Sequence, residues 1–146
     1  MEQVLAVLTA SQSALGADQT LLLGEVVDGG TLTDVTITLP PGATTLVGVY
    51  DASETPDDGF SLTLRRLSGG SVVDDDLATL VVDHTVSLVA EEPFVWVLGA
   101  DERDATTGDA ERSEIAAGDS LDVVVHQLGD SGLAIPAGAK IQAHLL

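Results

Sequence analysis

The fold is decided by the stretch Asp34-Val-Thr-Ile-Thr-Leu39, in which polar and apolar residues alternate strictly. Successive side chains of a β-strand point to opposite faces, so this pattern predicts a strand with one buried face and one solvated face. The same alternation occurs at residues 60–65 and, less strictly, at residues 121–126. Half-buried strands of this kind are typical of antiparallel sheets.

Outward from these stretches, strand patterns separated by Gly-, Pro- and Asp-rich turns continue along most of the 146 residues. Strands are expected at residues 4–9, 20–27, 32–39, 45–51, 60–66, 77–82, 85–90, 94–98, 120–127 and 139–145. This spacing predicts an all-β fold: a jelly-roll-like antiparallel β-sandwich of about ten short strands with little or no helix. The length suits a single β-sandwich domain over residues 1–146.

Residues 100–117 contain helix formers, but they lack the apolar stripe of a surface helix, and Thr106-Thr-Gly108 interrupts them. We interpret this segment as a long acidic loop with at most one short helical turn.

One turn pattern occurs three times, in Leu39-Pro-Pro-Gly42, Ile115-Ala-Ala-Gly118 and Ile135-Pro-Ala-Gly138. In each, an apolar residue ends one element and an apolar residue shortly after the glycine starts the next. Glycine adopts positive φ without steric cost, so we expect positive φ at all three glycines.

The composition is acidic and apolar at once: 24 Asp and Glu oppose 5 Lys and Arg, for a net charge of -19, while 45% of residues are hydrophobic. Disorder requires low hydrophobicity as well as high charge, so a folded chain is expected. Because lysine occurs once, we interpret the acid excess as adaptation to high salt, where charge repulsion is screened. An ordinary acidic soluble protein is the alternative.

Composition also argues against several partners. Phosphate binding needs clustered cations, and the adjacent pair Arg65-Arg66 is the nearest approach to a cluster, so nucleic acid is not an expected partner. Met1-Glu2-Gln3-Val4 lacks a basic region and no apolar run approaches about 18 residues, so neither a signal peptide nor membrane association is expected. There are no cysteines for disulfides or thiolate metal sites.

No catalytic motif stands out, and we predict that the chain is not an enzyme. The Gly-x-Ser-x-Gly nucleophile motif is absent, and His84, His126 and His144 do not have metal-binding spacing. The strands that carry His126 and His144 could pair and bring the two imidazoles together across a sheet.

Acidic runs are the candidates for binding a structural cation, Ca²⁺, Mg²⁺ or Na⁺, because such ions prefer oxygen ligands. The candidate ligands are Asp57, Asp58, Asp74, Asp75, Asp76, Asp101, Asp104 and Asp109. Solvated acidic loops are the alternative, and no other cofactor is expected.

The continuous apolar runs at residues 21–23 and 94–98 have two interpretations. They form central strands that are buried on both faces, or a neighbouring subunit covers their outer face. In the second case the five cations are candidates for interface ion pairs. These cations are Arg65, Arg66, Arg103, Arg112 and Lys140.

Two stretches carry a resemblance to known proteins. The first is Ile115-Ala-Ala-Gly-Asp-Ser-Leu-Asp-Val-Val-Val-His-Gln-Leu-Gly129 with residues 135–146, which resembles the end of viral and complement-type trimeric jelly rolls. The second is Ile37-Thr-Leu-Pro-Pro-Gly-Ala-Thr-Thr-Leu-Val-Gly-Val-Tyr50, which is similar to segments in structural proteins of tailed viruses. Together with the charge bias, the resemblance implies a capsid decoration, turret or tail accessory protein of a tailed virus infecting a halophilic host.

Such a protein is expected to be a homo-oligomer, with a trimer favoured, that contacts the major capsid protein or other virion proteins. It is expected in the virion, after assembly in the host cytoplasm. Two alternatives stay open. A tail or receptor-binding component would use residues 100–117 for contact, and a cellular carbohydrate-binding or adhesion domain would need an aromatic site built from the few aromatic residues.

Overall fold

Antiparallel strands form two five-stranded sheets and a separate two-stranded pair. The computed structural model describes residues 3–9, 19–48, 50, 59–97, 104–107, 114–128, 135–136 and 138–146, with only the backbone of residues 3–9, 19, 76 and 104–107. These residues include no α-helix, and the predicted all-β antiparallel sandwich is confirmed. No helix long and apolar enough to cross a membrane is found in this described part.

The first sheet has the order β1-β12-β3-β10, and β8 pairs with β3 beside β10. Its strands are β1 (Gln3–Thr9), β3 (Gly30–Thr38), β8 (Phe94–Val97), β10 (Glu114–Ile115) and β12 (Ala139–Leu145). Because β12 lies between β1 and β3, the two ends of the chain meet in one sheet, with Gln3 opposite Leu145.

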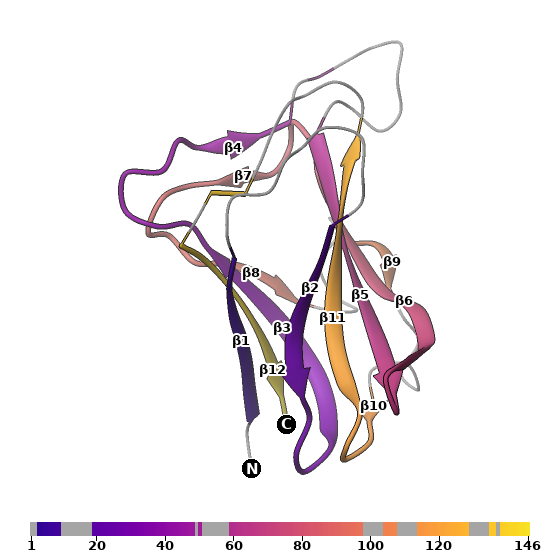
Figure 1. Cartoon of the computed structure of the whole chain (residues 1–146). Coiled ribbons are helices and arrows are strands. Elements are labelled where there is room, and N and C mark those ends of the chain that lie inside the picture. The colour runs from indigo at the N-terminus through magenta and orange to yellow at the C-terminus, as the bar shows by residue number, and fades with distance from the viewer. Residues whose placement is uncertain are drawn as a thin grey trace.

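The second sheet has the order β2-β11-β5-β6-β9 and forms the other layer of the sandwich (Figure 1). Its strands are β2 (Gln19–Glu25), β5 (Gly59–Ser68), β6 (Ser71–Val82), β9 (Asp104–Thr107) and β11 (Ser120–Leu128). The two-stranded pair consists of β4 (Leu46–Val47) and β7 (Ser87–Leu88).

The strand order is that of a jelly roll. Four antiparallel pairs are nested along the chain: β5 with β6, β3 with β8, β2 with β11, and β1 with β12. Successive pairs belong to alternate sheets, and the contacts of β5 with β11 and of β3 with β12 join them into layers. This arrangement gives the double-sheet jelly roll, with both termini at the same end of the sandwich (Figure 1).

The core lies between the sheets, and the alternating stretches point their apolar residues into it as predicted. The buried residues of β3, β5 and β11 include Val35, Ile37, Leu62, Leu64, Leu121 and Val123. The largest fully buried side chain is Trp96 of β8, with 0% of its surface exposed. Burial of these side chains is the main favourable contribution to folding.

The three repeated turns adopt one conformation. Gly42, Gly118 and Gly138 have φ of 78°, 90° and 88°, so the predicted positive φ is confirmed at each. In each turn an N–H donates to the carbonyl three residues earlier, for example from Ala43 to Pro40 at 3.2 Å. A positive φ at the third residue with this bond defines a type II turn.

Some strand boundaries differ from the prediction. Residues 100–117 are not one loop, because residues 104–107 form β9 against β6 and residues 114–115 form β10 against β3. The strand expected at residues 77–82 starts at Ser71, while those expected at 45–51 and 85–90 shorten to β4 and β7. Short strands can pair at the edge of a sheet even when their sequence lacks the alternation of polar and apolar residues that predicts a strand.

Substitution of Trp96 by Ala is expected to lower the free energy of unfolding by about 3–5 kcal/mol, because it leaves a large cavity in the core. Val95 is the matched control: it is the neighbouring residue of β8 and is 45% exposed. Val95→Ala should change stability by less than about 0.5 kcal/mol. Denaturant unfolding of both variants in molar KCl measures the difference, and equal effects would contradict the assigned core position of Trp96.

Candidate functional site

A bidentate ion pair lies at the centre of the solvent-facing side of the second sheet. Arg65 of β5 stands opposite Asp122 of β11 in the register. The Arg65 Nε–H donates to Asp122 Oδ1 at 2.9 Å, and Nη2 donates to Oδ2 at 2.7 Å. Two parallel hydrogen bonds from a guanidinium to one carboxylate form the strong, bidentate type of ion pair.

The carboxylate of this pair is well protected from water. Asp122 lies on an outward position of β11, yet only 3% of its surface is exposed. Its hydrogen bonds to Arg65 raise the pKa of the guanidinium against the opposing effect of burial, with smaller electrostatic contributions from Asp122 and Asp75. A raised pKa favours the charged form of the guanidinium.

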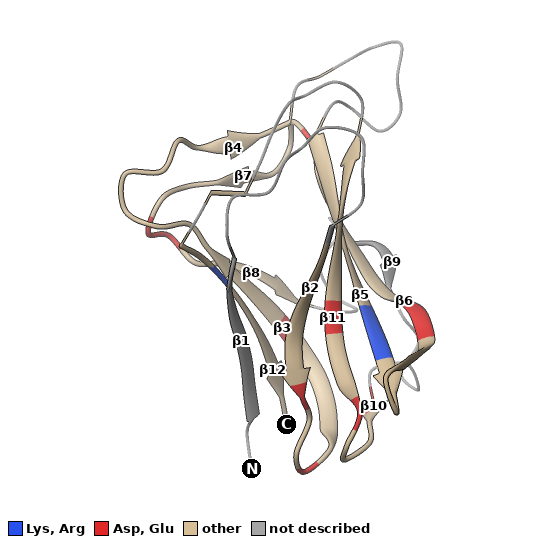
Figure 2. Cartoon of the chain, in the orientation of Figure 1, with Lys and Arg blue, Asp and Glu red and all other residues tan. Residues whose placement is uncertain are grey.

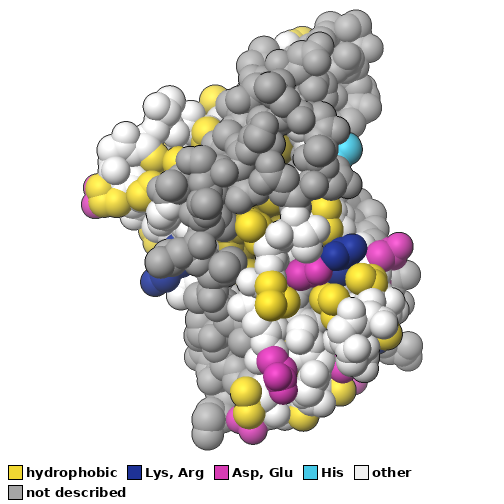
Figure 3. Space-filling view, viewed as in Figure 1, with side chains coloured by type: hydrophobic (Ala, Val, Ile, Leu, Met, Phe, Trp, Pro, Cys, Tyr) yellow, Lys and Arg dark blue, Asp and Glu magenta, His cyan; other side chains and the backbone are white. Residues whose placement is uncertain are grey.

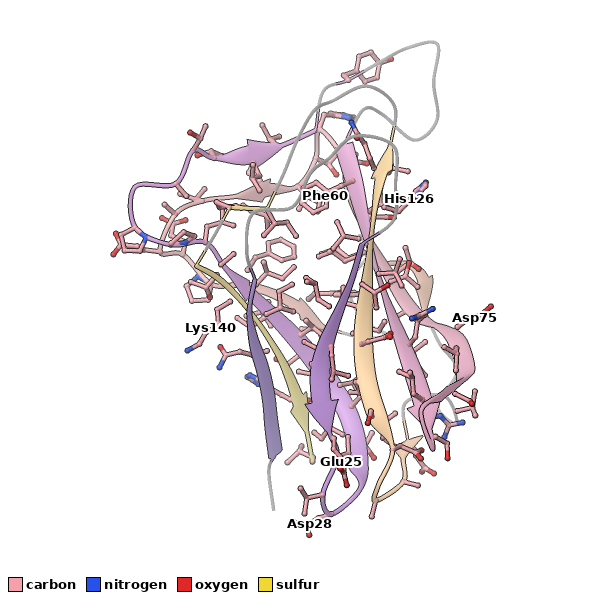
Figure 4. All side chains as sticks on the ribbon, viewed as in Figure 1. Glu25, Asp28, Phe60, Asp75, His126 and Lys140 are labelled. Carbon is pink, nitrogen blue, oxygen red and sulfur yellow. The ribbon has the colours of Figure 1, made fainter. Side chains whose placement is uncertain are left out.

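We call this surface the Arg65 face: the solvent-facing side of β2, β11, β5 and β6. Two hollows on it meet at Arg65. One, of 380 Å³, is lined by Ser61, Thr63, Arg65, Asp75, Val124 and His126. The other, of 710 Å³, is lined by Arg65, Val72, Val73, Asp74 and Asp75. His126 and Asp75 point away from the core on this side of the molecule (Figure 4).

Two threonine hydroxyl groups lie near the ion pair on the Arg65 face. Thr63 and Thr79 face each other across β5 and β6, and their Oγ1 atoms lie 3.1 Å apart in a hydrogen bond. Val124 stands beside Thr63 in the same cross-strand row. The space-filling view shows an acidic and a basic group side by side on this face, with hydrophobic groups next to them (Figure 3). The face is therefore mixed in polarity, and Asp74 and Asp75 add negative charge beside the Arg65–Asp122 pair.

The opposite side of the sandwich, the solvent-facing side of β12, β3 and β8, is called the His144 face. Here His144 Nδ1 lies 3.2 Å from Asp34 Oδ2, and the pair is ionic only when His144 is protonated. Lys140 of β12 is exposed on this side, and no described carboxylate forms an ion pair with it. Figure 4 shows Lys140 pointing away from the core.

The second cation of β5 also finds a carboxylate. Arg66 Nη1 lies 3.7 Å from Asp119 Oδ2, in the turn that precedes β11. The Arg66 Nε is buried and has no hydrogen-bond partner among the described residues. The predicted interface cations Arg65 and Arg66 thus form ion pairs within the chain, while Arg103 and Arg112 lie outside the described residues.

The predicted cation ligands are only partly described. Asp74 and Asp75 lie in β6 opposite Arg65 and Arg66, where the register with β5 shifts and leaves extra residues in β6. The side chains of Asp76 and Asp104 are not described, and Asp57, Asp58, Asp101 and Asp109 lie outside the described residues. Within the described part, no three His, Asp or Glu side chains are close enough to hold one metal ion.

The expected meeting of His126 and His144 is wrong. β11 belongs to the second sheet and β12 to the first, so the two imidazoles lie on opposite sides of the sandwich. The jelly-roll order places the consecutive strands β11 and β12 in different sheets, so they do not form a hairpin. His84 lies elsewhere, in edge-to-face contact with Tyr50 at a ring-centroid distance of 5.2 Å.

The apolar runs are not central strands buried on both faces. β2 is the edge strand of its sheet, and Leu22 within it is 61% exposed. Among the described strands β8 pairs with β3 alone, and Val95 and Val97 are 45% and 42% exposed. Of the two interpretations of these runs, the one with a covering subunit stays open.

Comparisons with known proteins give little guidance. No family model matches the chain, and no curated protein matches it. A chain in the structure of infectious bursal disease virus, Gx strain, is similar over 99% of this chain at 13% identity, with a TM-score of 0.35. This chain spans 33% of the length of that viral chain. A similarity of this size carries no argument about function.

The partners Asp122, Asp119 and Asp34 were not predicted from the sequence. Sequence analysis singled out Arg65 and Arg66 only as candidates for interface ion pairs, and it gave no partner for His144. Arg65 and Asp122 are separated by 57 residues, and only the pairing of β5 with β11 makes them neighbours.

Arg65→Met should lower the free energy of unfolding by about 2 kcal/mol, because the nearly buried Asp122 carboxylate loses its donors. The double variant Arg65→Met with Asp122→Leu should recover at least about half of the loss. Lys140→Met is the control, since Lys140 has no described carboxylate partner, and it should change stability by less than about 0.5 kcal/mol. Denaturant unfolding measures all three, and an Arg65→Met effect equal to the control would contradict the pair.

Proposed function

We propose that this chain is a non-enzymatic structural protein of a virion, which self-associates and decorates or stabilises a capsid at high salt. The placement of the described carboxylates carries the proposal. On the outward positions of the regular strands there are two, Asp34 and Asp122, and each lies within ion-pair distance of a basic side chain. The others lie in turns, at strand ends or in the irregular part of β6 (Figure 2). They are Glu25, Asp28, Asp74, Asp75, Asp83, Glu91, Glu92, Glu114 and Asp119.

This distribution suits a protein that is covered on its broad faces. Burial of an unpaired charge is costly, whereas an ion pair that is already desolvated can be covered with much less loss. Apart from Asp74 and Asp75, which line the hollows of the Arg65 face, these acidic groups would remain in solvent and keep the assembly soluble. The jelly-roll strand order is a second support, because residues 115–129 with residues 135–146 resemble the end of viral and complement-type trimeric jelly rolls. Residues 37–50 are similar to segments in structural proteins of tailed viruses.

Within this proposal the partners are other copies of the chain and the major capsid protein or another virion protein. The resemblance to trimeric jelly rolls favours a trimer. A tail location, with residues 100–117 in contact with a receptor, is the alternative within a virion.

The positions of the aromatic residues argue against the carbohydrate-binding alternative. Trp96 and Phe60 are buried in the core, and Phe94 is half-buried against it. Tyr50 is exposed but lies next to His84, away from both sheet faces, so the four aromatic side chains do not form a common platform.

The mass of the purified protein in molar KCl, from light scattering behind a sizing column, tests the proposal. We expect a closed assembly of more than one copy. Binding of that assembly to empty capsids, measured by co-sedimentation, should follow. A chain that stays monomeric at high protein concentration in molar KCl would contradict the proposed function.

The melting temperature is expected to rise from low salt to molar KCl. The Debye length falls from about 30 Å at 0.01 M to about 3 Å at 1 M, which screens repulsion among the carboxylates of a chain with net charge -19. A variant with Asp28→Asn, Glu91→Gln and Glu92→Gln should depend less on salt. Equal melting temperatures in low and high salt, measured by circular dichroism, would contradict the high-salt part of the proposal.

A further inference from the structure

Few links attach β1 to the rest of the sandwich. It lies at the edge of the first sheet and, among the described strands, pairs with β12 alone (Figure 1). Within this chain one connection, residues 10–18, joins β1 to the other strands. β1 can therefore leave the sheet without breaking the pairing of any two other strands.

The strand that β1 covers cannot be left bare without cost. Ala139, Ile141, Ala143 and Leu145 of β12 each have 0% of their surface exposed. If β1 left, the backbone groups along this edge of β12 would lose their partners, and an unpaired edge of this kind accepts another strand. β1 of a second copy has the same sequence, so it restores the same seven-residue register with β12.

We propose that β1 is exchanged between copies, so that in the self-associated protein β1 of each copy pairs with β12 of a neighbour. This inference rests on the self-association in the proposed function and specifies its form. Exchange of an identical element needs no new contact surface, because the contacts of the single chain are kept. When each copy gives β1 to the next, the contact is head-to-tail, and it can close into a ring such as the trimer that the resemblance favours.

Charge favours an exchange of β1 over docking of two outer surfaces. Each copy has a net charge of -19, so docking brings carboxylates of two copies together. Residues 3–17, which include β1, carry no charged residue, and residues 139–145 of β12 include no carboxylate. The exchanged strand pair therefore places no like charges opposite each other. Its backbone hydrogen bonds do not depend on ion pairs, which molar salt screens.

The connection is long enough for the exchange. Residues 10–18 separate the end of β1 at Thr9 from the start of β2 at Gln19. An extended chain spans at most about 3.3–3.6 Å for each residue, so this connection reaches about 30 Å. The two sheets of a sandwich are stacked only about 10 Å apart. The connection therefore has the length to carry β1 from its own sandwich to the β12 edge of an adjacent copy.

The concentration of copies sets the balance between the two forms. In a single chain, a short connection holds β1 near its own β12 at an effective concentration in the millimolar range. Because the strand contacts are the same in both forms, exchange increases where copies are crowded to a similar concentration. Copies side by side on a capsid meet this condition, so the exchange would link decorating copies to one another at the place where they act.

Pairs of cysteines test the exchange, because the chain has no cysteine of its own. Ala6 of β1 stands opposite Gln142 of β12, and Gln142 stands opposite Thr36 of β3 on its other side. Residues that stand opposite in an antiparallel pair have the Cα separation of a disulfide. The double variant Ala6→Cys with Gln142→Cys is oxidised at high protein concentration in molar KCl and sized under denaturing, non-reducing conditions. We expect covalent multimers with the number of copies in the native assembly.

The matched control is Thr36→Cys with Gln142→Cys, which joins β12 to β3. Neither strand is exchanged, so this variant should give covalent monomers only. Covalent multimers in equal amount from the control would show random cross-linking and would contradict the exchange. Circular dichroism confirms the fold of each variant, and light scattering gives the size of the wild-type assembly.

The outcomes separate this inference from the proposed function. A wild-type assembly whose Ala6→Cys, Gln142→Cys variant forms covalent multimers, while the control does not, supports both. The same assembly with covalent monomers from both variants overturns the exchange and leaves self-association standing. A wild-type chain that stays monomeric overturns both. If the first variant loses its β-sheet spectrum, Leu8→Cys with Lys140→Cys gives the same test at another pair of opposite residues. Covalent monomers from that variant overturn the exchange.

Discussion

The whole structure depends on the insertion of β12 between β1 and β3. Ala139, Ile141, Ala143 and Leu145 of this strand are all fully buried, so the last residues of the chain complete the core that the first sheet contributes. The pairing joins residues from opposite ends of the sequence, which is costly in chain entropy if formed first. Nesting reduces that cost, because each inner pair, from the β5–β6 hairpin outward, brings the strands of the next pair closer together.

Much of this architecture could be predicted from local patterns. Alternation in residues 34–39, 60–65 and 121–126 identified the buried faces correctly, and turn chemistry predicted the positive φ of the three turn glycines. The alternation of polar and apolar residues did not predict the strands at places where the strand pairing is irregular. The acidic residues 74–76 do not look like a strand, yet extra residues in β6 opposite Arg65 accommodate them. β9 and β10 are four and two residues long, and they are strands because they pair with β6 and β3.

The candidate site was harder to predict than the fold, because its rows depend on register. Arg65 was singled out as a candidate for an interface ion pair, but nothing local identified Asp122, which is 57 residues away. The position of Leu22 next to this pair depends further on a shift in the β2–β11 register between Leu121 and Asp122. Without that irregularity a different residue of β2 would stand opposite Asp122. One extra residue in a strand thus determines which side chain faces the solvent.

The placement of the two termini has a mechanical consequence. Gln3 stands opposite Leu145, and Leu146 exchanges two backbone hydrogen bonds with Thr31 at the same end of the first sheet. A force that pulls the two ends apart would open the β1–β12 ladder from that end, so its hydrogen bonds would break one after another instead of sharing the load. The sandwich is therefore weak toward tension between its termini.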